Sequence, residues 1–235
     1  MTDALITADA NRRMFDTIAR RYDLTNRILS FGLDRHWRKK AIQALVPADD
    51  KLYLDVGCGT GDVMIELLRQ APAARVWGID PADKMLEVAR YKLNEIQSLD
   101  RTDLLNADAC NLPFDDGIFG GIISAFCFRN ITDRRQALAE AKRTLSSGGR
   151  LVLLELTITE RSWLAPFYKL HSRGIVPFVG RLVGNREAYQ YLSDSIYDFS
   201  CNVDVEEMMR NAGFSHVEKM PLSGGIVTIF VGQRL

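Results

Sequence analysis

The stretch from Lys51 to Asp62, KLYLDVGCGTGD, constrains the fold of this chain more than any other part of it. The apolar run at residues 52–56 predicts a short buried strand. Glycines follow at alternate positions, where they permit positive φ and let a ligand approach the main chain closely. Thr60 or Asp62 is then expected to cap a helix over residues 63–70. A strand, a glycine turn and a helix N-terminus together predict a nucleotide-binding cradle.

Two kinds of nucleotide compete for this cradle, and an ordinary strand-to-helix turn is the third interpretation. A dinucleotide fingerprint needs glycine or alanine three residues after its second glycine, whereas Gly57 and Gly59 are followed by Asp62. A carboxylate at that position would repel a pyrophosphate. Asp55 and Asp62 instead favour a ligand with a positive centre and no phosphate, such as S-adenosylmethionine. Asp80 ends the next apolar run, where it is placed to accept hydrogen bonds from ribose hydroxyls.

Composition narrows the class of protein. The chain has 235 residues, 47% of them hydrophobic, which predicts one large globular domain. Basic and acidic residues balance at 30 each, so no net charge points to a nucleic-acid partner. The four cysteines are scattered, which argues against a disulfide framework or a zinc site and favours a reducing compartment. Without a secretory signal or a membrane-spanning apolar run, we expect a cytoplasmic protein, or one peripheral at the inner face of a membrane.

The order of predicted elements indicates the α/β class, with a parallel, doubly wound sheet over residues 49–157. The other predicted elements of this core are strands at 76–79, 104–105, 118–126 and 150–156 and helices from Pro81 to about Leu99 and from a cap at Thr132 to Leu145. Residues 1–48 are expected to form a lid of three helices, at 11–22, 24–29 and 37–45. Residues 205–235 predict a closing helix, 205–211, and a strand pair, 217–222 and 226–231.

Residues 158–204 interrupt the alternation with an insertion rich in aromatic and arginine residues. This composition suits an apolar lid over a lipid tail, a membrane interface or an ordinary core. His171 in this insertion is a candidate general base, although lone histidines are more often structural or exposed. Asp108 and Ala109, which follow the third strand, are expected to bind an adenine through a carboxylate and a backbone N–H. No spacing of histidines or cysteines predicts a metal site.

Four tracts resemble the UbiE/MenG quinone C-methyltransferases: ARRYDLTNRILSFGLDRHWR, LDVGCGTGD, AFCFRNITD, and GNREAYQYLSDSI with the closing GGIVTIFVGQR. The resemblance runs from about Met14 to Arg234. It implies a Rossmann-like class I methyltransferase, with a seven-stranded, mostly parallel sheet, helices on both faces and an N-terminal helical lid. The chain departs from the family at Cys127 and Phe128, where relatives usually have glycine and leucine, and at Ala125, where a small polar residue is common.

The resemblance implies S-adenosylmethionine as cofactor and a prenylated quinol as substrate. Demethylmenaquinol is the preferred acceptor, and a methoxy-polyprenyl-benzoquinol or another small aromatic or lipid acceptor is the alternative. A non-catalytic scaffold that binds the nucleoside is a third hypothesis. The expected oligomeric state is open and includes a homodimer. The predicted cofactor-binding residues are Asp55, Gly57, Gly59, Thr60, Asp80, Asp108, Ala109 and Ala125.

Three residues are predicted to serve the methyl acceptor. A ring carbon becomes a strong nucleophile when a neighbouring hydroxyl ionises, and a phenol has a pKa of about 10, so a base or cation must assist. The resemblance implies that Arg129 stabilises the phenolate, directly or through a water, that Asn130 orients the hydroxyl, and that Tyr22 lines the pocket. The alternatives are an exposed arginine for Arg129, a helix cap for Asn130 and a simple turn around Tyr22.

Overall fold

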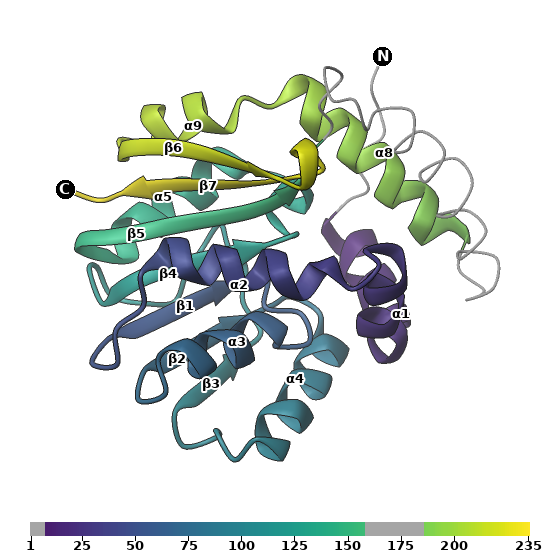
Figure 1. Ribbon diagram of the computed structural model, residues 1–235, viewed down its shortest axis with the longest axis horizontal. Helices are drawn as coiled ribbons and strands as arrows, with labels where there is room; N and C mark the ends of the chain where they lie inside the picture. The colour runs from purple at the N-terminus through teal and green to yellow at the C-terminus, as the bar shows by residue number, and fades with distance from the viewer. Residues whose placement is uncertain (1–7, 158–185) are drawn as a thin grey trace.

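The computed structural model of this protein describes residues 8–157 and 186–235 (Figure 1). Most of the predicted aromatic insertion, with the candidate base His171, lies outside the described residues. The predictions for that segment therefore stay predictions.

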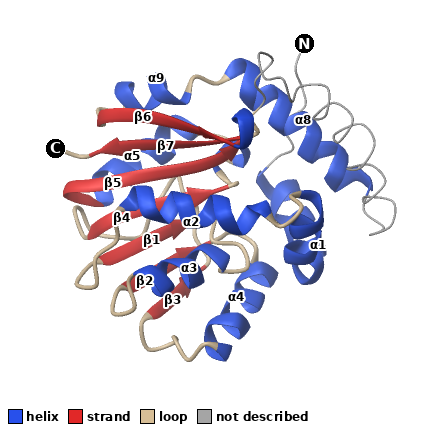
Figure 2. Cartoon of the chain, in the orientation of Figure 1, coloured by secondary structure: helices blue, strands red, loops and turns tan. Residues whose placement is uncertain are grey.

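A single mixed sheet forms the centre of the fold (Figure 2). Its seven strands lie in the order β3-β2-β1-β4-β5-β7-β6. Their bounds are β1 Leu52–Val56, β2 Arg75–Ile79, β3 Thr102–Leu105, β4 Phe119–Ala125, β5 Leu145–Leu156, β6 Ser215–Leu222 and β7 Val227–Gln233. The first five strands are parallel, and β7 runs antiparallel to both β5 and β6. The chain order reverses between β1 and β4, and ligands of such sheets bind where the carboxyl ends of the two strands diverge.

Helices surround the sheet and follow the predicted order. Their bounds are α1 Ala8–Leu29, α2 Leu33–Leu45, α3 Asp62–Gln70, α4 Asp83–Glu95, η1 Phe128–Asn130, α5 Arg134–Thr144, α8 Arg186–Asn202, α9 Val205–Asn211 and η3 Ser223–Gly225. The predicted boundary between helices at 11–22 and 24–29 is wrong, because α1 runs through it without a glycine or proline to stop it. The break comes at Gly32, whose φ of 78° ends the first helical segment as predicted.

Both predicted helix caps are wrong. The N-cap of α3 is Gly61, without a side-chain bond, because the Thr60 hydroxyl donates to Asp23 of α1 instead. The N-cap of α5 is Asp133, whose carboxylate accepts from the backbone N–H of Gln136, in place of the predicted Thr132. An aspartate at that position fits the helix N-terminus because its charge complements the helix dipole.

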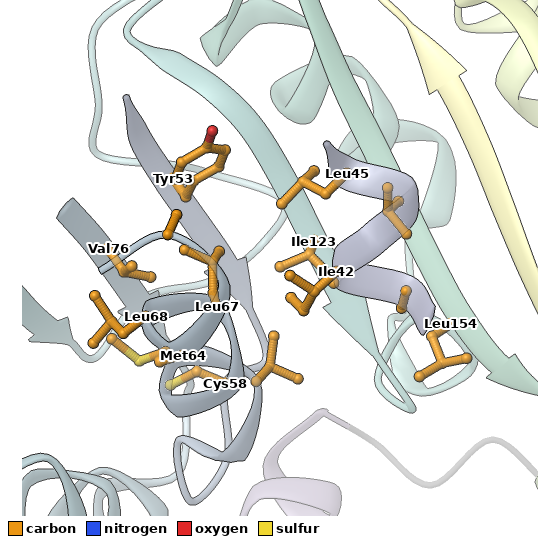
Figure 3. Packing of buried hydrophobic residues seen from close by; sticks show 14 of the residues in the cluster. Ile42, Leu45, Tyr53, Cys58, Met64, Leu67, Leu68, Val76, Ile123 and Leu154 are labelled. Atoms are coloured by element: carbon orange, nitrogen blue, oxygen red, sulfur yellow. The ribbon is translucent and has the colours of Figure 1, made fainter. Parts of the chain in front are cut away.

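Alternation along the strands divides the core between the two faces of the sheet. Tyr53 and Ile123 point to the face covered by α2 and α3, and Leu54 and Ile122 point to the opposite face. Figure 3 shows the first face, where Ile42 of α2 and the apolar side of α3 pack over β1 and β4. The central strands β1 and β4 are buried on both faces, as expected for a parallel sheet. This packing fixes the strand ends from which the candidate site is built.

Candidate active site

The glycine turn after β1 is tight on one side and open on the other. Gly57 and Cys58 donate their N–H groups to Ile79 O at 2.8 and 2.9 Å, which ties the turn to the end of β2. A Cβ placed on Gly57, whose φ is 70°, would lie 2.1 Å from Cys127 Sγ. A Cβ placed on Gly59 would meet no atom within 4 Å. The turn therefore adjoins the segment after β4 and leaves open space beside Gly59.

Asp80 lies against this turn, as predicted. Its Oδ2 accepts from Gly59 N at 2.9 Å and its Oδ1 accepts from Ala82 N at 2.9 Å. Burial raises the pKa of Asp80 to about 6, against the opposing effect of the two backbone hydrogen bonds. Each carboxylate oxygen can accept a further bond, so the predicted ribose contact is compatible with both backbone bonds.

Asp55 is a fully buried carboxylate at the end of β1. Among the described residues neither of its oxygens has a hydrogen-bond partner. Burial raises its pKa well above the ordinary value, and the charge of Asp80 raises it further. An unpartnered carboxyl group in a buried site is costly unless a ligand satisfies it. The acidic cradle fits a ligand that carries a sulfonium and an ammonium, and it does not fit a pyrophosphate.

An ionic network joins the lid to the cradle. Asp23 of α1 accepts from Thr60 Oγ1 at 2.5 Å and from Lys92 Nζ of α4 at 2.8 Å. Lys92 also pairs with Asp62, and Arg38 of α2 lies 3.7 Å from the same carboxylate. Burial alone would raise the pKa of Asp62, but Lys92 and Arg38 outweigh it and hold the pKa below its ordinary value. Sequence reasoning missed Lys92 and Arg38: the i,i+4 spacing links Arg38 with Asp34, but no spacing links either cation with Asp62.

Arg129 is buried, so the alternative of an exposed arginine is wrong. It lies on η1 directly after β4, with 5% of its side chain exposed. Its Nη1 donates to Glu155 Oε2 at 2.9 Å and to Phe126 O at 2.5 Å, and its backbone N–H donates to Glu155 Oε1 at 3.0 Å. Its Nε is buried without a partner among the described residues. The one sequence signal for Glu155 is an acidic residue inside the apolar run LVLLEL.

Asn130 follows Arg129 on η1, and Tyr22 of α1 lies within reach of the charge of Arg129. Asn130 Oδ1 accepts from the Tyr191 hydroxyl of α8 at 3.1 Å, and Asp133 takes the capping role that was the alternative for Asn130. Burial raises the pKa of Tyr22, while the charge of Arg129 and a bond from Asn26 oppose that rise. Tyr191 of α8 thus joins Asn130 beside Arg129, whereas the predicted role of Tyr22 stays a prediction.

The remaining predicted residues lie at strand ends around the same edge of the sheet. Asp108 is exposed, and its Oδ1 accepts from Cys110 N at 2.9 Å, with the half-buried Ala109 between them. Ala125 ends β4, and the preceding Ser124 donates its hydroxyl to Val56 O at 2.8 Å, which joins the ends of β4 and β1. Within residues 8–157 and 186–235, no group of three or more potential ligands is placed to hold a metal ion.

Comparison with known proteins gives a family and a fold. The ubiE/COQ5 methyltransferase family matches residues 6–234. Similar proteins include demethylmenaquinone methyltransferases of Thermus thermophilus, 42% identical over 94% of this chain and 100% of the relative, and of Thermotoga maritima, 41% identical over 95% of each. A ubiquinone/menaquinone biosynthesis C-methyltransferase UbiE of Geotalea uraniireducens is 37% identical over 95% of each chain.

Solved structures agree at the level of the fold. A SAM-dependent methyltransferase of Thermotoga maritima, described as a possible histamine N-methyltransferase, superposes with a TM-score of 0.65 at 19% identity over 95% of this chain and 99% of that one. The [4+2]-cyclase SpnF gives a TM-score of 0.64 at 16% identity over 97% of each chain. These likenesses confirm the predicted Rossmann-like class I methyltransferase fold.

Proposed function

Because the chain belongs to the ubiE/COQ5 methyltransferase family, we propose that it methylates a ring carbon of demethylmenaquinol. It is an S-adenosylmethionine-dependent methyltransferase that acts on a quinone. Relatives at 41 and 42% identity are named for demethylmenaquinone, which favours the menaquinone precursor over the ubiquinone precursor.

The acidic cradle is where we propose that the cofactor binds. When bound, S-adenosylmethionine supplies an electrophilic methyl group on a sulfonium. Gly57 and Gly59 would allow it to approach the backbone, Asp80 would accept from the ribose, and the unpartnered Asp55 would offset its positive charge. Asp108, Ala109 and Ala125 are proposed for the adenine side and the floor of the same site.

One observation carries the assignment of the acceptor: the buried Nε–H of Arg129 has no partner among the described residues, and Arg129 adjoins the cradle through the close approach of Cys127 to Gly57. Methylation at carbon requires a ring hydroxyl to lose its proton. The ring carbon then forms its bond to the methyl carbon as the carbon–sulfur bond breaks, and the displaced ring proton leaves. A fixed guanidinium lowers the energy of the ionised ring oxygen, because it is already oriented in a water-poor site.

The test is single-turnover methyl transfer to demethylmenaquinol by wild type and Arg129→Ala. We expect the variant to lose about 10²–10³-fold in rate with little change in cofactor affinity, because Arg129 acts on the acceptor. Arg129→Lys should not restore the rate, since an ammonium lacks the planar fork. Arg135→Ala, which removes an exposed arginine of α5, is the control.

A wild-type rate in Arg129→Ala, measured at a temperature at which the variant is folded, would remove Arg129 from the reaction. A methoxy-polyprenyl-benzoquinol assayed in parallel decides the acceptor. Methylation of that compound without methylation of demethylmenaquinol would overturn the menaquinone assignment and leave the enzyme class in place.

The substrate is a membrane lipid, and for that reason we also propose contact with the inner face of the cytoplasmic membrane. No described helix combines the length and apolar character needed to cross a bilayer. Leu24 and Ile28, one turn apart on α1, are 65% and 50% exposed, and apolar side chains of this kind can enter a lipid surface. Sedimentation with anionic vesicles, for wild type and a Leu24→Ser/Ile28→Ser variant, tests the contact. Analytical ultracentrifugation tests the proposed homodimer.

A further inference from the structure

The hydrogen bond between Tyr191 and Asn130 fixes the direction of an amide in the candidate site. The Tyr191 hydroxyl donates to Asn130 Oδ1 at 3.1 Å. The backbone of Asn130 is held as well, since its N–H donates to Cys127 O at 2.8 Å and its carbonyl accepts from Asn11 Nδ2 at 3.4 Å. With the amide oxygen engaged by Tyr191, the amide NH₂ group remains to meet a ligand.

Tyr191 is itself held firmly. Its side chain is 9% exposed, on a helix that packs against η1. The ring of Phe199, further along α8, packs edge-to-face on Phe128, with 6.3 Å between the two ring centroids. Arg134 Cζ lies 5.6 Å from the centroid of the same Phe199 ring. Arg134 in turn donates to the carbonyls of Phe128 and Arg129. Helix α8 and the loop that carries Asn130 therefore form one packed unit, which places the hydroxyl of Tyr191 accurately.

The polar groups around Asn130 are also donors. Arg129 Nε–H is buried and unpartnered among the described residues. The hydroxyl of Tyr22 can donate as well as accept. Glu155, the carboxylate paired with Arg129, already accepts at both oxygens from that residue. Burial raises the pKa of both Tyr22 and Tyr191, and the charge of Arg129 opposes this larger effect.

We propose that this cluster is an oxyanion site that selects the ionised form of the acceptor's ring oxygen, and that Tyr191 is the positioning residue that makes Asn130 a donor to it. A neutral hydroxyl would need an acceptor, whereas an oxyanion is satisfied by donors alone. The identity of the acceptor rests on the proposed function, but the preference for an anion follows from the donors themselves.

Binding of two coloured ring compounds tests the preference for an anion. The probes are 2-hydroxy-1,4-naphthoquinone, a weak acid that is ionised at neutral pH, and 1,4-naphthoquinone, which cannot ionise. Asn130→Asp keeps an acceptor for Tyr191 but replaces the donor with a negative oxygen. We expect it to weaken binding of the ionised probe about 10- to 100-fold, and binding of the neutral probe less than threefold. Equal affinity of wild type and Asn130→Asp for the ionised probe would overturn the oxyanion site.

Methyl transfer tests the role of Tyr191. We expect Tyr191→Phe to lower kcat about tenfold with little change in the KM of either substrate, and to have no further effect in an Asn130→Ala background. Tyr197→Phe, which alters a 60% exposed tyrosine of the same helix, is the matched control. Equal kcat values for Tyr191→Phe and Tyr197→Phe, or an undiminished effect of Tyr191→Phe in the Asn130→Ala background, would refute the positioning role.

The two kinds of failure remain distinguishable. A wild-type protein that prefers the ionised probe but does not methylate demethylmenaquinol would overturn the proposed acceptor and support the oxyanion site. If the wild type methylates demethylmenaquinol, but both the wild type and Asn130→Asp bind the two probes equally, the oxyanion site is overturned and the proposed acceptor is supported.

Discussion

The ion pair between Arg129 and Glu155 is closed to water, with 5% and 0% of the two side chains exposed. Glu155→Ala removes the partner of Arg129 Nη1 at 2.9 Å and the acceptor of the Arg129 backbone N–H at 3.0 Å. The guanidinium then keeps Phe126 O as its acceptor but has no negative charge beside it. Removing one partner of a buried pair costs about 3–5 kcal/mol. We expect the free energy of unfolding to fall by this amount.

A second variant separates stability from catalysis. Replacing both partners with apolar residues of similar volume, as in Arg129→Met/Glu155→Leu, removes the buried charges together. Such replacements are often neutral or stabilising by about 1–4 kcal/mol, but the buried backbone N–H of residue 129 loses Glu155 Oε1 as its acceptor, so we expect a stability between those of Glu155→Ala and the wild type. Methyl transfer should nevertheless stay at the level of Arg129→Ala, because the donor to the ring oxygen is gone.

Urea unfolding followed by circular dichroism gives the free energies, and single-turnover methyl transfer gives the rates. A loss of less than about 1 kcal/mol in Glu155→Ala would show that water or another group satisfies Arg129, against its burial. Wild-type turnover by the double variant would refute the role of this pair in the reaction.

Three further predictions concern the cradle and the lid. Burial raises the pKa of Asp80 to about 6 from its ordinary 3.8. This group therefore favours folding most below pH 4, and it loses about 3 kcal/mol of that contribution as pH rises through 6. In urea unfolding of the unliganded protein, Asp80→Asn should not show this loss of stability, and identical pH profiles for the wild type and the variant would contradict the prediction. Gly57→Ala should destabilise the fold by about 2–4 kcal/mol, since its Cβ would lie 2.1 Å from Cys127 Sγ. Gly59→Ala, at a φ of 53° but with no atom within 4 Å of the new Cβ, should cost only about 1 kcal/mol and weaken S-adenosylmethionine binding in calorimetry. The opposite ranking of the two variants in stability would refute the geometry of the turn. Asp23→Ala removes the residue that joins α1 to Thr60 and Lys92. It should speed amide hydrogen exchange in α1 about fivefold, which corresponds to a loss of roughly 1 kcal/mol from a half-exposed ionic network. Unchanged exchange would show that the network does not hold the lid.

The fold was predictable because its strongest signals are local. The apolar run before Gly57, the three alternate glycines and Asp80 specify a strand, a turn and a second strand end, and the structure places Asp80 Oδ2 on Gly59 N. The reversal of strand order at β1 and β4 follows from the alternation of strands and helices. Arg129 and Asn130 follow β4 directly, so their place beside the cradle was predictable once β4 was recognised.

The partners of these residues were not predictable, because they come from distant parts of the chain. Glu155 is 26 residues from Arg129, and Tyr191 is 61 residues from Asn130. Residues this far apart meet only through the packing of β5 and α8, which no local pattern encodes. The helix caps failed for a similar reason, since the hydroxyl of Thr60 is drawn to the lid by tertiary contact.

The meeting of β1 and β4 has an evolutionary consequence. The proposed cofactor residues at the ends of β1 and β2 come from the first half of the sheet, whereas Asn130 and Tyr191 come from η1 and α8, on the side of β4 and β5. Mutations on α8 that reshape the acceptor side therefore do not touch the turn around Gly57 and Gly59. A lineage with this topology can acquire new acceptors by altering its flanking helices, while selection on the methyl donor keeps one half of the sheet constant.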